Sequence, residues 1–145
     1  MKQSKMIASE LVSHIMTNHV ICVSIKDDLR HVIDLIKKEK IRHVPVVDGN
    51  QIKGIISSTD LNRLTFSNLF EQQDNSEDAI LDMLSIDQVM HAHPMTVNSS
   101  NTIKEVAEIF ANHHFHALPV MEDNQLVGIV TTTDIIKYLL QQFES

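Results

Sequence analysis

Apolar residues with the period of an amphipathic helix occur at two places in the chain. Both places show the spacing i, i+3, i+4, i+7, in Leu29, Val32, Ile33 and Ile36 and again in Ile103, Val106, Ala107 and Phe110. Asp27 or Asp28 can cap the first helix, and Thr102 with Glu105 has capping-box spacing before the second. The pattern therefore predicts two helices of the same design.

Short apolar or β-branched stretches lie around each predicted helix and predict three strands for each. They are Val20–Ile25, Val44–Val47 and Ile52–Ser57 around the first helix, and Met95–Asn98, Leu118–Met121 and Leu126–Thr131 around the second. A crossover through the helix should make the first two strands of each set parallel, and a polar turn should pair the last two antiparallel. Pro45 and Pro119, the second residues of the middle strands, favour an edge strand or a strand start.

The two sets are copies of one sequence unit. Shifted by 74 positions, Val12–Leu61 aligns with Ile86–Ile135 without a gap, and 12 of the 50 pairs are identical, against about three expected by chance. With a second helix beginning near Asp60 and near Asp134, each copy has the order β-α-β-β-α, a fold of the α/β (α+β) class. A unit of about 50 residues is marginal by itself, so we expect the copies to pack against each other around one core.

Composition and charge narrow the class of protein. The 145 residues carry 12 Lys and Arg against 19 Asp and Glu, a formal charge of −7, so we expect no nucleic-acid partner. The sequence has no apolar run near the roughly 20 residues of a membrane helix and no secretion signal, which predicts a cytoplasmic protein without a membrane partner. The single cysteine, Cys22, excludes an internal disulfide and a multi-cysteine zinc site.

Three pieces of sequence recur in the same order in both copies. They are Ile15-Met16-Thr17 and Val89-Met90-His91, then 41–48 and 115–122, and finally 54–60 and 128–134. In these pieces each copy resembles a CBS domain, the module named after cystathionine β-synthase, and the pair resembles a Bateman module. The resemblance covers 11–66 as repeat 1 and 85–143 as repeat 2, with a helical and polar linker at 67–84.

The resemblance implies two repeats related by a pseudo-two-fold axis and packed as one module, with two clefts between them. Family members commonly bind adenine nucleotides or S-adenosylmethionine in these clefts, act as regulatory sensors and self-associate into dimers. The resemblance therefore implies that the regulatory ligand is an adenine nucleotide such as AMP, ADP or ATP, or else NAD or S-adenosylmethionine. No cofactor is required in this interpretation, and the second partner is an unidentified regulated protein.

Asp60 and Asp134 are the first candidates for ligand contacts, because an ionised carboxylate can accept hydrogen bonds from both hydroxyls of a ribose. Hydroxyls close to them in the sequence belong to Ser57, Thr59, Thr131 and Thr133. The alternative is that each aspartate is only a helix N-cap and that the hydroxyls satisfy a turn. Gly54 and Gly128 let the backbone approach a ligand or a neighbouring strand closely.

The resemblance also implies positions for adenine and phosphate contacts. The adenine positions hold Ile21, Cys22 and Ile41 in the first copy, and Met95, Thr96 and Phe115 in the second. The phosphate positions hold Thr17 and His43 in the first copy, and His91 and Ala117 in the second, so the usual arginine two residues before the proline is absent. Arg42 and His116 lie one residue earlier and are candidates to replace this arginine, although neighbouring side chains of a strand point to opposite faces. We therefore expect unequal clefts, with phosphate binding that weakens as pH rises through the histidine range.

Metal and catalytic chemistry have weaker support. His91, His93, His113, His114 and His116 have spacings found among metal ligands, but no cysteine or His-Glu-x-x-His motif accompanies them, so we expect no metal site. The sequence has no nucleophile elbow and no Walker loop. Cys22 lies in a predicted apolar strand, where a buried structural thiol is the default. We therefore expect no enzymatic activity.

Two functions remain open. The first is a sensor of an adenine nucleotide that signals to a partner protein, which the aspartate in both copies favours. The second is a ligand-free CBS pair that serves as a dimerisation or scaffolding module, which the missing arginines favour. Apolar residues beyond each aspartate predict an interface patch and a homodimer. They are Leu61, Leu64, Leu69, Phe70, Ile135, Ile136, Leu139, Leu140 and Phe143.

Overall fold

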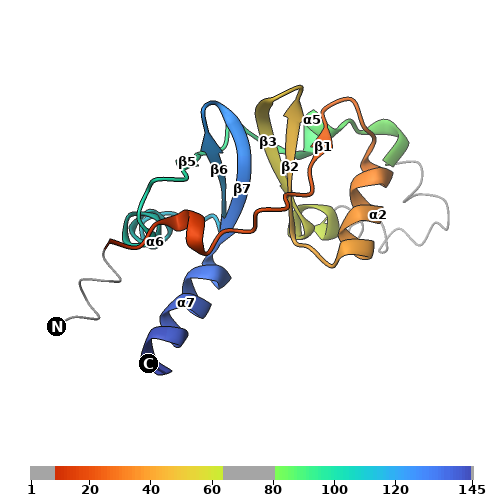
Figure 1. The fold of residues 1–145 in the computed structure, drawn as a ribbon. Coiled ribbons are helices and arrows are strands. Elements are labelled where there is room, and N and C mark those ends of the chain that lie inside the picture. Colours follow the sequence, from red (N-terminus) through yellow and green to blue (C-terminus); the bar gives the residue numbers. More distant parts are fainter. Residues whose placement is uncertain (1–8, 64–80, 145) are drawn as a thin grey trace. The chain divides into compact units, whose positions relative to one another are not determined.

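The computed structural model describes residues 9–63 and 81–144, so the expected linker lies largely outside the described residues. The elements up to the linker are η1 (Val12–His14), β1 (Val23–Ser24), α2 (Leu29–Glu39), β2 (His43–Asp48) and β3 (Gln51–Ser57), followed by a helical segment at 58–63. Those after it are α5 (Ile86–Val89), β4 (His91–Ala92), β5 (Val97–Asn98), α6 (Ile103–Ala111), β6 (Ala117–Glu122), β7 (Gln125–Thr131) and α7 (Thr132–Glu144) (Figure 1). The predicted order β-α-β-β-α is therefore present twice.

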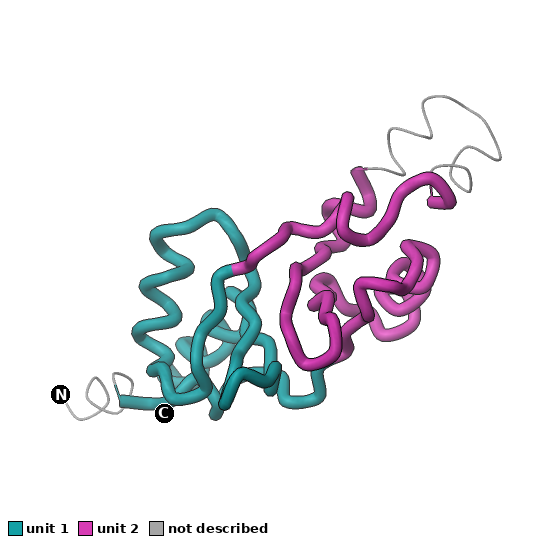
Figure 2. The backbone as a smooth tube through the Cα atoms, turned by 90° about the horizontal axis from the view of Figure 1, so that it is seen from above, with its two compact units in different colours: residues 1–20, 95–145 teal, residues 21–94 magenta. Residues whose placement is uncertain are grey.

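The chain folds into two compact units that differ from its two sequence repeats. The central unit comprises residues 21–94, and the terminal unit comprises residues 1–20 together with 95–145 (Figure 2). Each unit holds the strands and the first helix of one repeat. The segment before the first strand of each repeat, 12–17 in repeat 1 and 86–92 in repeat 2, is called its leading segment. Each leading segment belongs to the unit that holds the strands of the other repeat.

Local side-chain hydrogen bonds start the two amphipathic helices as their sequences predict. Asp28 caps α2 and accepts a hydrogen bond from the backbone N–H of His31 at 2.9 Å. Thr102 and Glu105 form the predicted capping box of α6, each side chain accepting from the other residue's backbone N–H at 3.1 and 2.8 Å. The Glu105 carboxylate accepts hydrogen bonds from the Thr102 N–H and also from the side chains of Thr102 and Asn101, and these bonds hold the pKa of Glu105 below its ordinary value.

The strand pairing within each unit follows the prediction, except at the prolines. The sheet of the central unit has the order β1-β2-β3-β4, and that of the terminal unit has the order β5-β6-β7. The first pair in each is parallel and the hairpin pair is antiparallel. Pro45 and Pro119 are the third residues of β2 and β6, which are interior strands, so the expectation of an edge or a strand start is wrong. The parallel ladder on β2 joins only Val46 and Val47, so it has no bond at Pro45 to lose.

The leading segments cross between repeats by the same pairing in both units. In the central unit β4 pairs antiparallel with β3, so that His91 lies opposite Ile55. In the terminal unit Thr17 lies opposite Ile129 in an antiparallel bridge with hydrogen bonds of 2.9 and 3.1 Å in the two directions. Both pairs occupy the same positions of the two repeats. The crossing is therefore reciprocal.

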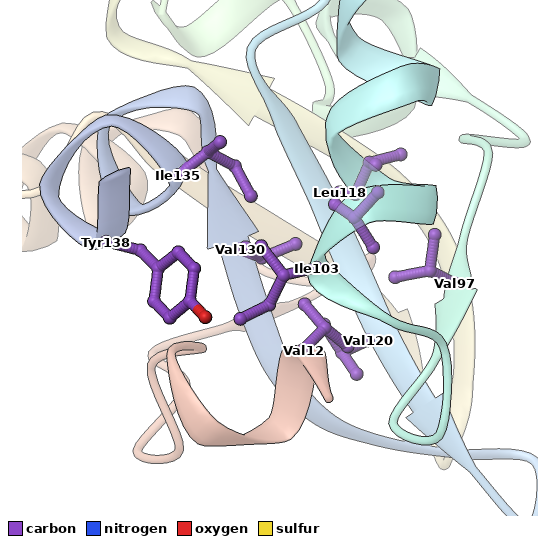
Figure 3. Close-up of a cluster of buried hydrophobic side chains, with 9 residues drawn as sticks. Val12, Val97, Ile103, Leu118, Val120, Val130, Ile135 and Tyr138 are labelled. Carbon is purple, nitrogen blue, oxygen red and sulfur yellow. The ribbon is translucent and has the colours of Figure 1, made fainter. Parts of the chain in front are cut away.

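Buried apolar side chains form two clusters, one in each unit, so the expectation of a single core is wrong. Val12 of η1 is fully buried in the cluster of the terminal unit, among side chains of α6, β6 and β7 (Figure 3). The equivalent residue of repeat 2, Ile86 of α5, is fully buried in the cluster of the central unit. Each core is thus completed by a segment of the other repeat. This explains how a repeat that is too small to be stable by itself becomes part of a complete core.

Candidate functional site

Asp60 and Asp134 lie at the point where the third strand of each unit passes into a helix. In the central unit, the Asp60 carboxylate accepts through Oδ2 from the Ser57 N–H at 3.2 Å and from the Ser57 hydroxyl at 2.8 Å. The Ser57 hydroxyl in turn accepts from the Asp60 N–H at 3.1 Å. In the terminal unit, Asp134 Oδ2 accepts from the Thr131 N–H at 2.9 Å, and the Thr131 hydroxyl accepts from the Asp134 N–H at 3.2 Å. Both are reciprocal capping boxes.

This geometry corrects the N-cap alternative for the two aspartates. The N-cap residues are Ser57 and Thr131, and each aspartate is the third residue of its helix and reaches back to the cap. The cap occupies Oδ2 of each carboxylate, and on Asp60 it supplies that oxygen with two donors. Oδ1 is the oxygen left for a further partner. Contact of the Asp60 carboxylate with two ribose hydroxyls, which the sequence suggested, stays a prediction.

A histidine from the other repeat contacts Asp60. His91 Nε2 lies 3.2 Å from Asp60 Oδ2 and 3.3 Å from Asp60 Oδ1. The His91 side chain is 71% exposed, whereas that of Asp60 is only 12% exposed. The equivalent position in the terminal unit holds Thr17, an exposed residue that cannot carry a charge.

The residues before the prolines add to the difference between the units. His43 pairs with Ser57 across the β2–β3 ladder, and Ala117 pairs with Thr131 across β6–β7, so each is the cross-strand neighbour of a cap. Arg42 and His116 are exposed, and their carbonyls accept from Ser58 N–H at 2.8 Å and from Thr132 N–H at 3.0 Å. The central unit therefore carries more side chains able to hold positive charge near its capping box.

The positions expected to contact adenine lie before the first strand of each unit and before the middle strand. Ile41 and Phe115 are partly buried and pack against the two cores. Ile21 is partly buried, and Met95 and Thr96 are exposed. Thr59 and Thr133, one residue ahead of the aspartates, are also exposed.

Cys22 departs from the sequence expectation. It precedes β1 and is exposed, so the prediction of a buried thiol within a strand is wrong. The segment from Val20 is apolar, but only Val23 and Ser24 pair with β2, which leaves Cys22 ahead of the ladder. Partial desolvation and the charge of Asp27 raise the pKa of the thiol, so it is a poorer nucleophile than an ordinary cysteine.

The histidines near the end of α6 have structural partners. The His113 ring lies 2.7 Å, through Nδ1, from the carbonyl oxygen of Ile109 in the last turn of α6. The same ring stacks on Phe115, with centroids 4.9 Å apart and planes 18° from parallel. In residues 9–63 and 81–144 no group of three or more His, Cys, Asp or Glu side chains is placed to hold a metal ion.

The candidate residues separate cleanly between the units. We call the capping box of Ser57 and Asp60, together with His91, the central site, and the box of Thr131 and Asp134, together with Thr17, the terminal site. The central unit also holds the candidates Ile21, Cys22, Ile41, Arg42, His43 and Thr59. The terminal unit also holds Met95, Thr96, Phe115, His116 and Thr133. Each unit thus combines residues of both repeats.

Comparison with known proteins gives the family. The model of the CBS domain matches residues 12–66 and 86–141, which make up most of the chain. A relative in Methanocaldococcus jannaschii, the uncharacterized protein MJ1225, is 27% identical over 132 residues, which are 90% of this chain and 47% of that protein. The chain therefore spans about half the length of this relative. The crystal structure of MJ1225 has a TM-score of 0.78 to this chain, with 26% identity.

Two further solved structures share the fold and hold ligands. One is CBSX2 of Arabidopsis thaliana in complex with AMP, with a TM-score of 0.73, 23% identity and coverage of 91% of this chain and 97% of that one. The other is the CBS domain pair of MJ0100 in complex with 5′-methylthioadenosine and S-adenosyl-L-methionine, with a TM-score of 0.72, 24% identity and coverage of 89% and 98%. None of the helices in the described part of the chain is long and apolar enough to cross a membrane.

Proposed function

Because the chain belongs to the CBS domain family, we propose that it is a regulatory module that binds an adenine nucleotide and signals the bound state to a partner protein. The observation that carries the proposal is the pair of capping boxes, each of which presents a carboxylate with one oxygen, Oδ1, left by the cap. Pairs of the same fold hold AMP in CBSX2, and S-adenosyl-L-methionine with 5′-methylthioadenosine in MJ0100.

In this proposal each group of the two sites has a role in binding. Oδ1 of Asp60 or Asp134 accepts a hydrogen bond from a ribose hydroxyl, and the exposed hydroxyl of Thr59 or Thr133 adds a second polar contact. The capping box holds each carboxylate in place before the ligand arrives, which reduces the entropy lost on binding. Partly buried Ile41 and Phe115 offer apolar surface to a purine.

We propose that the module regulates without catalysis. The raised pKa of Cys22 makes its thiol a poor nucleophile, and the Ser57 hydroxyl is held in the helix cap by Asp60. The second candidate function, a ligand-free dimerisation or scaffolding module, is favoured by one specific observation. Ala117 occupies a phosphate position in the terminal unit and offers a ligand no polar group.

A thermal-shift screen with AMP, ADP, ATP, NAD and S-adenosylmethionine tests the proposal. A ligand present at 100 times its Kd stabilises the folded protein by about 2.7 kcal/mol. We expect at least one of these adenine compounds to raise Tm in a concentration-dependent manner. No shift with any of them would favour the scaffolding function.

Alanine at either aspartate is expected to weaken binding at its own site by about 1.5–3 kcal/mol, because a charge-assisted hydrogen bond is lost. The measurement is calorimetric titration of Asp60→Ala and Asp134→Ala with the nucleotide identified by the screen. Asp60→Asn is the matched control for stability, because its amide oxygen can still accept from the Ser57 N–H. Wild-type affinity in both alanine variants would contradict the assignment of the ribose contact.

The outer face of α7 supports the homodimer that the sequence predicts. Exposed apolar side chains follow the spacing i, i+3, i+4, i+7 in Ile136, Leu139, Leu140 and Phe143. Ile135 and Leu61, which the sequence assigned to the same patch, are instead buried in the two cores. Leu64, Leu69 and Phe70 lie outside the described residues. A face of this kind is typical of an interface between copies of a chain.

Light scattering at micromolar concentration is expected to give a dimer for the wild type. Leu140→Asp should raise the dimer Kd by at least about 100-fold, or about 2.7 kcal/mol, because a charge would be buried in the interface. Lys137→Glu, on the same helix, is the control and should leave the dimer intact. A monomeric wild type would refute the prediction.

A further inference from the structure

The contact between His91 and Asp60 joins the two groups that the proposed function assigns to one ligand. His91 Nε2 lies within 3.3 Å of both oxygens of the Asp60 carboxylate, including Oδ1, the oxygen left by the cap. The imidazole therefore contacts the acceptor that a ribose hydroxyl would use in the proposed function. A protonated imidazole strengthens this contact, because it is then charge-assisted.

The backbone of His91 is fixed, whereas its side chain is not enclosed. Pairing of β4 with β3 holds the His91 backbone opposite Ile55. The imidazole is 71% exposed, and the carboxylate it contacts is 12% exposed. Rotation of the imidazole away from Asp60 therefore needs no change in the sheet.

Among the described residues, one carboxylate is placed in contact with the His91 imidazole. Asp60 is the acidic group in contact with it. The other titratable side chains on β4's sheet neighbours and on the described segments beside them are Lys53 of β3, His43 and Asp48 of β2, Arg63 of the helical segment, His93 after β4 and Asp87 of α5. Most of these are cations or potential cations, so an anion entering the site would attract the imidazolium away from Asp60.

The terminal site is the natural comparison, because it has the same capping box without the histidine. Thr17 occupies the position of His91, with its backbone bonded to Ile129 in both directions. Ala117 occupies the position of His43. Within 9–63 and 81–144, Asp134 has no counterpart of the His91 contact, so in this part of the chain no imidazole has to leave its Oδ1 before a ribose binds.

We propose that His91 is a charge-selective gate of the central site, which holds Asp60 closed against neutral nucleosides and releases it to nucleosides that carry a phosphate. A phosphate offers the imidazolium a second acceptor, so His91 turns from Asp60 to the phosphate and frees Oδ1 for the ribose. A neutral nucleoside has to compete with His91 for Oδ1. As pH falls, the gate therefore strengthens discrimination in favour of the phosphorylated ligand, while the terminal site responds little. This inference rests on the proposed function.

The test compares adenosine with AMP, which differ only in the phosphate, by calorimetry at about pH 6 and about pH 8, on either side of the range in which histidine changes charge. Asp134→Ala is the background in which the central site is measured, with folding checked by its thermal melt. We expect the ratio of AMP affinity to adenosine affinity to rise about tenfold from pH 8 to pH 6. In Asp134→Ala/His91→Thr, the ratio should change by less than about threefold. Comparing the two proteins at each pH removes the effect of the phosphate's own titration near pH 6.

The reciprocal variant provides an independent measurement. Thr17→His in an Asp60→Ala background should give the terminal site a pH-dependent preference for AMP that Asp60→Ala alone lacks. If both ligands bind and the ratio of AMP affinity to adenosine affinity is the same with and without His91, the gate is overturned and the proposed function stands. Absence of any binding of adenosine or AMP in the wild type, with the other adenine compounds also inactive, would instead overturn the proposed function and the gate with it.

Discussion

Replacement of Gly54 by alanine is expected to destabilise the protein by about 1–3 kcal/mol, because the added methyl group has no room. A methyl group on Gly54 would lie 2.8 Å from Met90 Cγ, in contact with Met90 Sδ, and 2.9 Å from the carbonyl oxygen of His91. The methionine side chain can move, but the His91 carbonyl belongs to β4, which is paired with β3. In a domain of this size, Tm should fall by roughly 2–4 °C for each kcal/mol.

Gly128 is the matched comparison, because it faces the same segment of the other repeat. A methyl group there would meet Met16 Sδ as closely as one on Gly54 meets Met90 Sδ, but it would lie 3.0 Å from Met16 Cγ and 3.1 Å from the Thr17 carbonyl oxygen, slightly farther than the same atoms at Gly54. We therefore expect Gly128→Ala to be destabilising, but less than Gly54→Ala, in thermal melts of both variants. A melt of Gly54→Ala at the wild-type temperature would show that the leading segment does not pack on β3.

These contacts resolve a choice that the sequence left open at the two glycines. The sequence allowed close approach of either a ligand or a neighbouring strand at Gly54 and Gly128. In both units the approaching group is the Met of the leading segment, which explains why Met16/Met90 and Gly54/Gly128 are identical pairs between the repeats. Gly54 packs against Met90 and Gly128 packs against Met16, so each identical pair of residues belongs to the same contact in both units.

Local features of the fold were predictable because their causes are local. Successive residues of the apolar stripe of α6 lie three or four positions apart, its capping box joins residues three apart, and the turns of the two hairpins are equally short. The reciprocal crossing was not predictable, because a constant offset between repeats contains no information on which copy a segment packs against. The prediction that Pro45 marks an edge strand was wrong for a similar reason. The sequence does not show that β1 pairs with β2 only at Val46 and Val47, which leaves Pro45 outside the parallel ladder.

The contacts of the candidate site also separate into local ones, which the sequence could predict, and long-range ones, which it could not. Each sequence motif identified residues with suitable chemistry, and the capping spacing of Ser57 with Asp60 was visible as three residues. The contact of His91 with Asp60 spans 31 positions and depends on the crossing of the leading segment. Sequence reasoning could therefore predict that the two sites differ, but it could not assign His91 to the carboxylate of repeat 1.

Alanine at Ile86 is expected to have the largest effect on stability, a loss of about 2–5 kcal/mol. Ile86 is fully buried in the cluster of the central unit, together with Val23, Leu29 and Val44. Truncation removes apolar contacts and leaves a cavity that the surrounding strands can only partly fill. Met83, in the same stretch of sequence, is 79% exposed, so Met83→Ala is the control and should change stability by less than about 0.5 kcal/mol.

The elements in which amide hydrogen exchange becomes faster distinguish the crossed packing from packing within each repeat. Although Ile86 belongs to repeat 2 in the sequence, amide hydrogen exchange in Ile86→Ala should accelerate mainly in β2, β3 and α2 of the central unit. Val12→Ala should produce the reverse, a loss of about 1.5–3 kcal/mol with faster exchange in β6, β7 and α6. If Ile86→Ala instead exposed α6 and β6, each repeat would be packing on its own leading segment. The shared site of His91 and Asp60 would then have no structural basis, because the same crossing brings those two residues together.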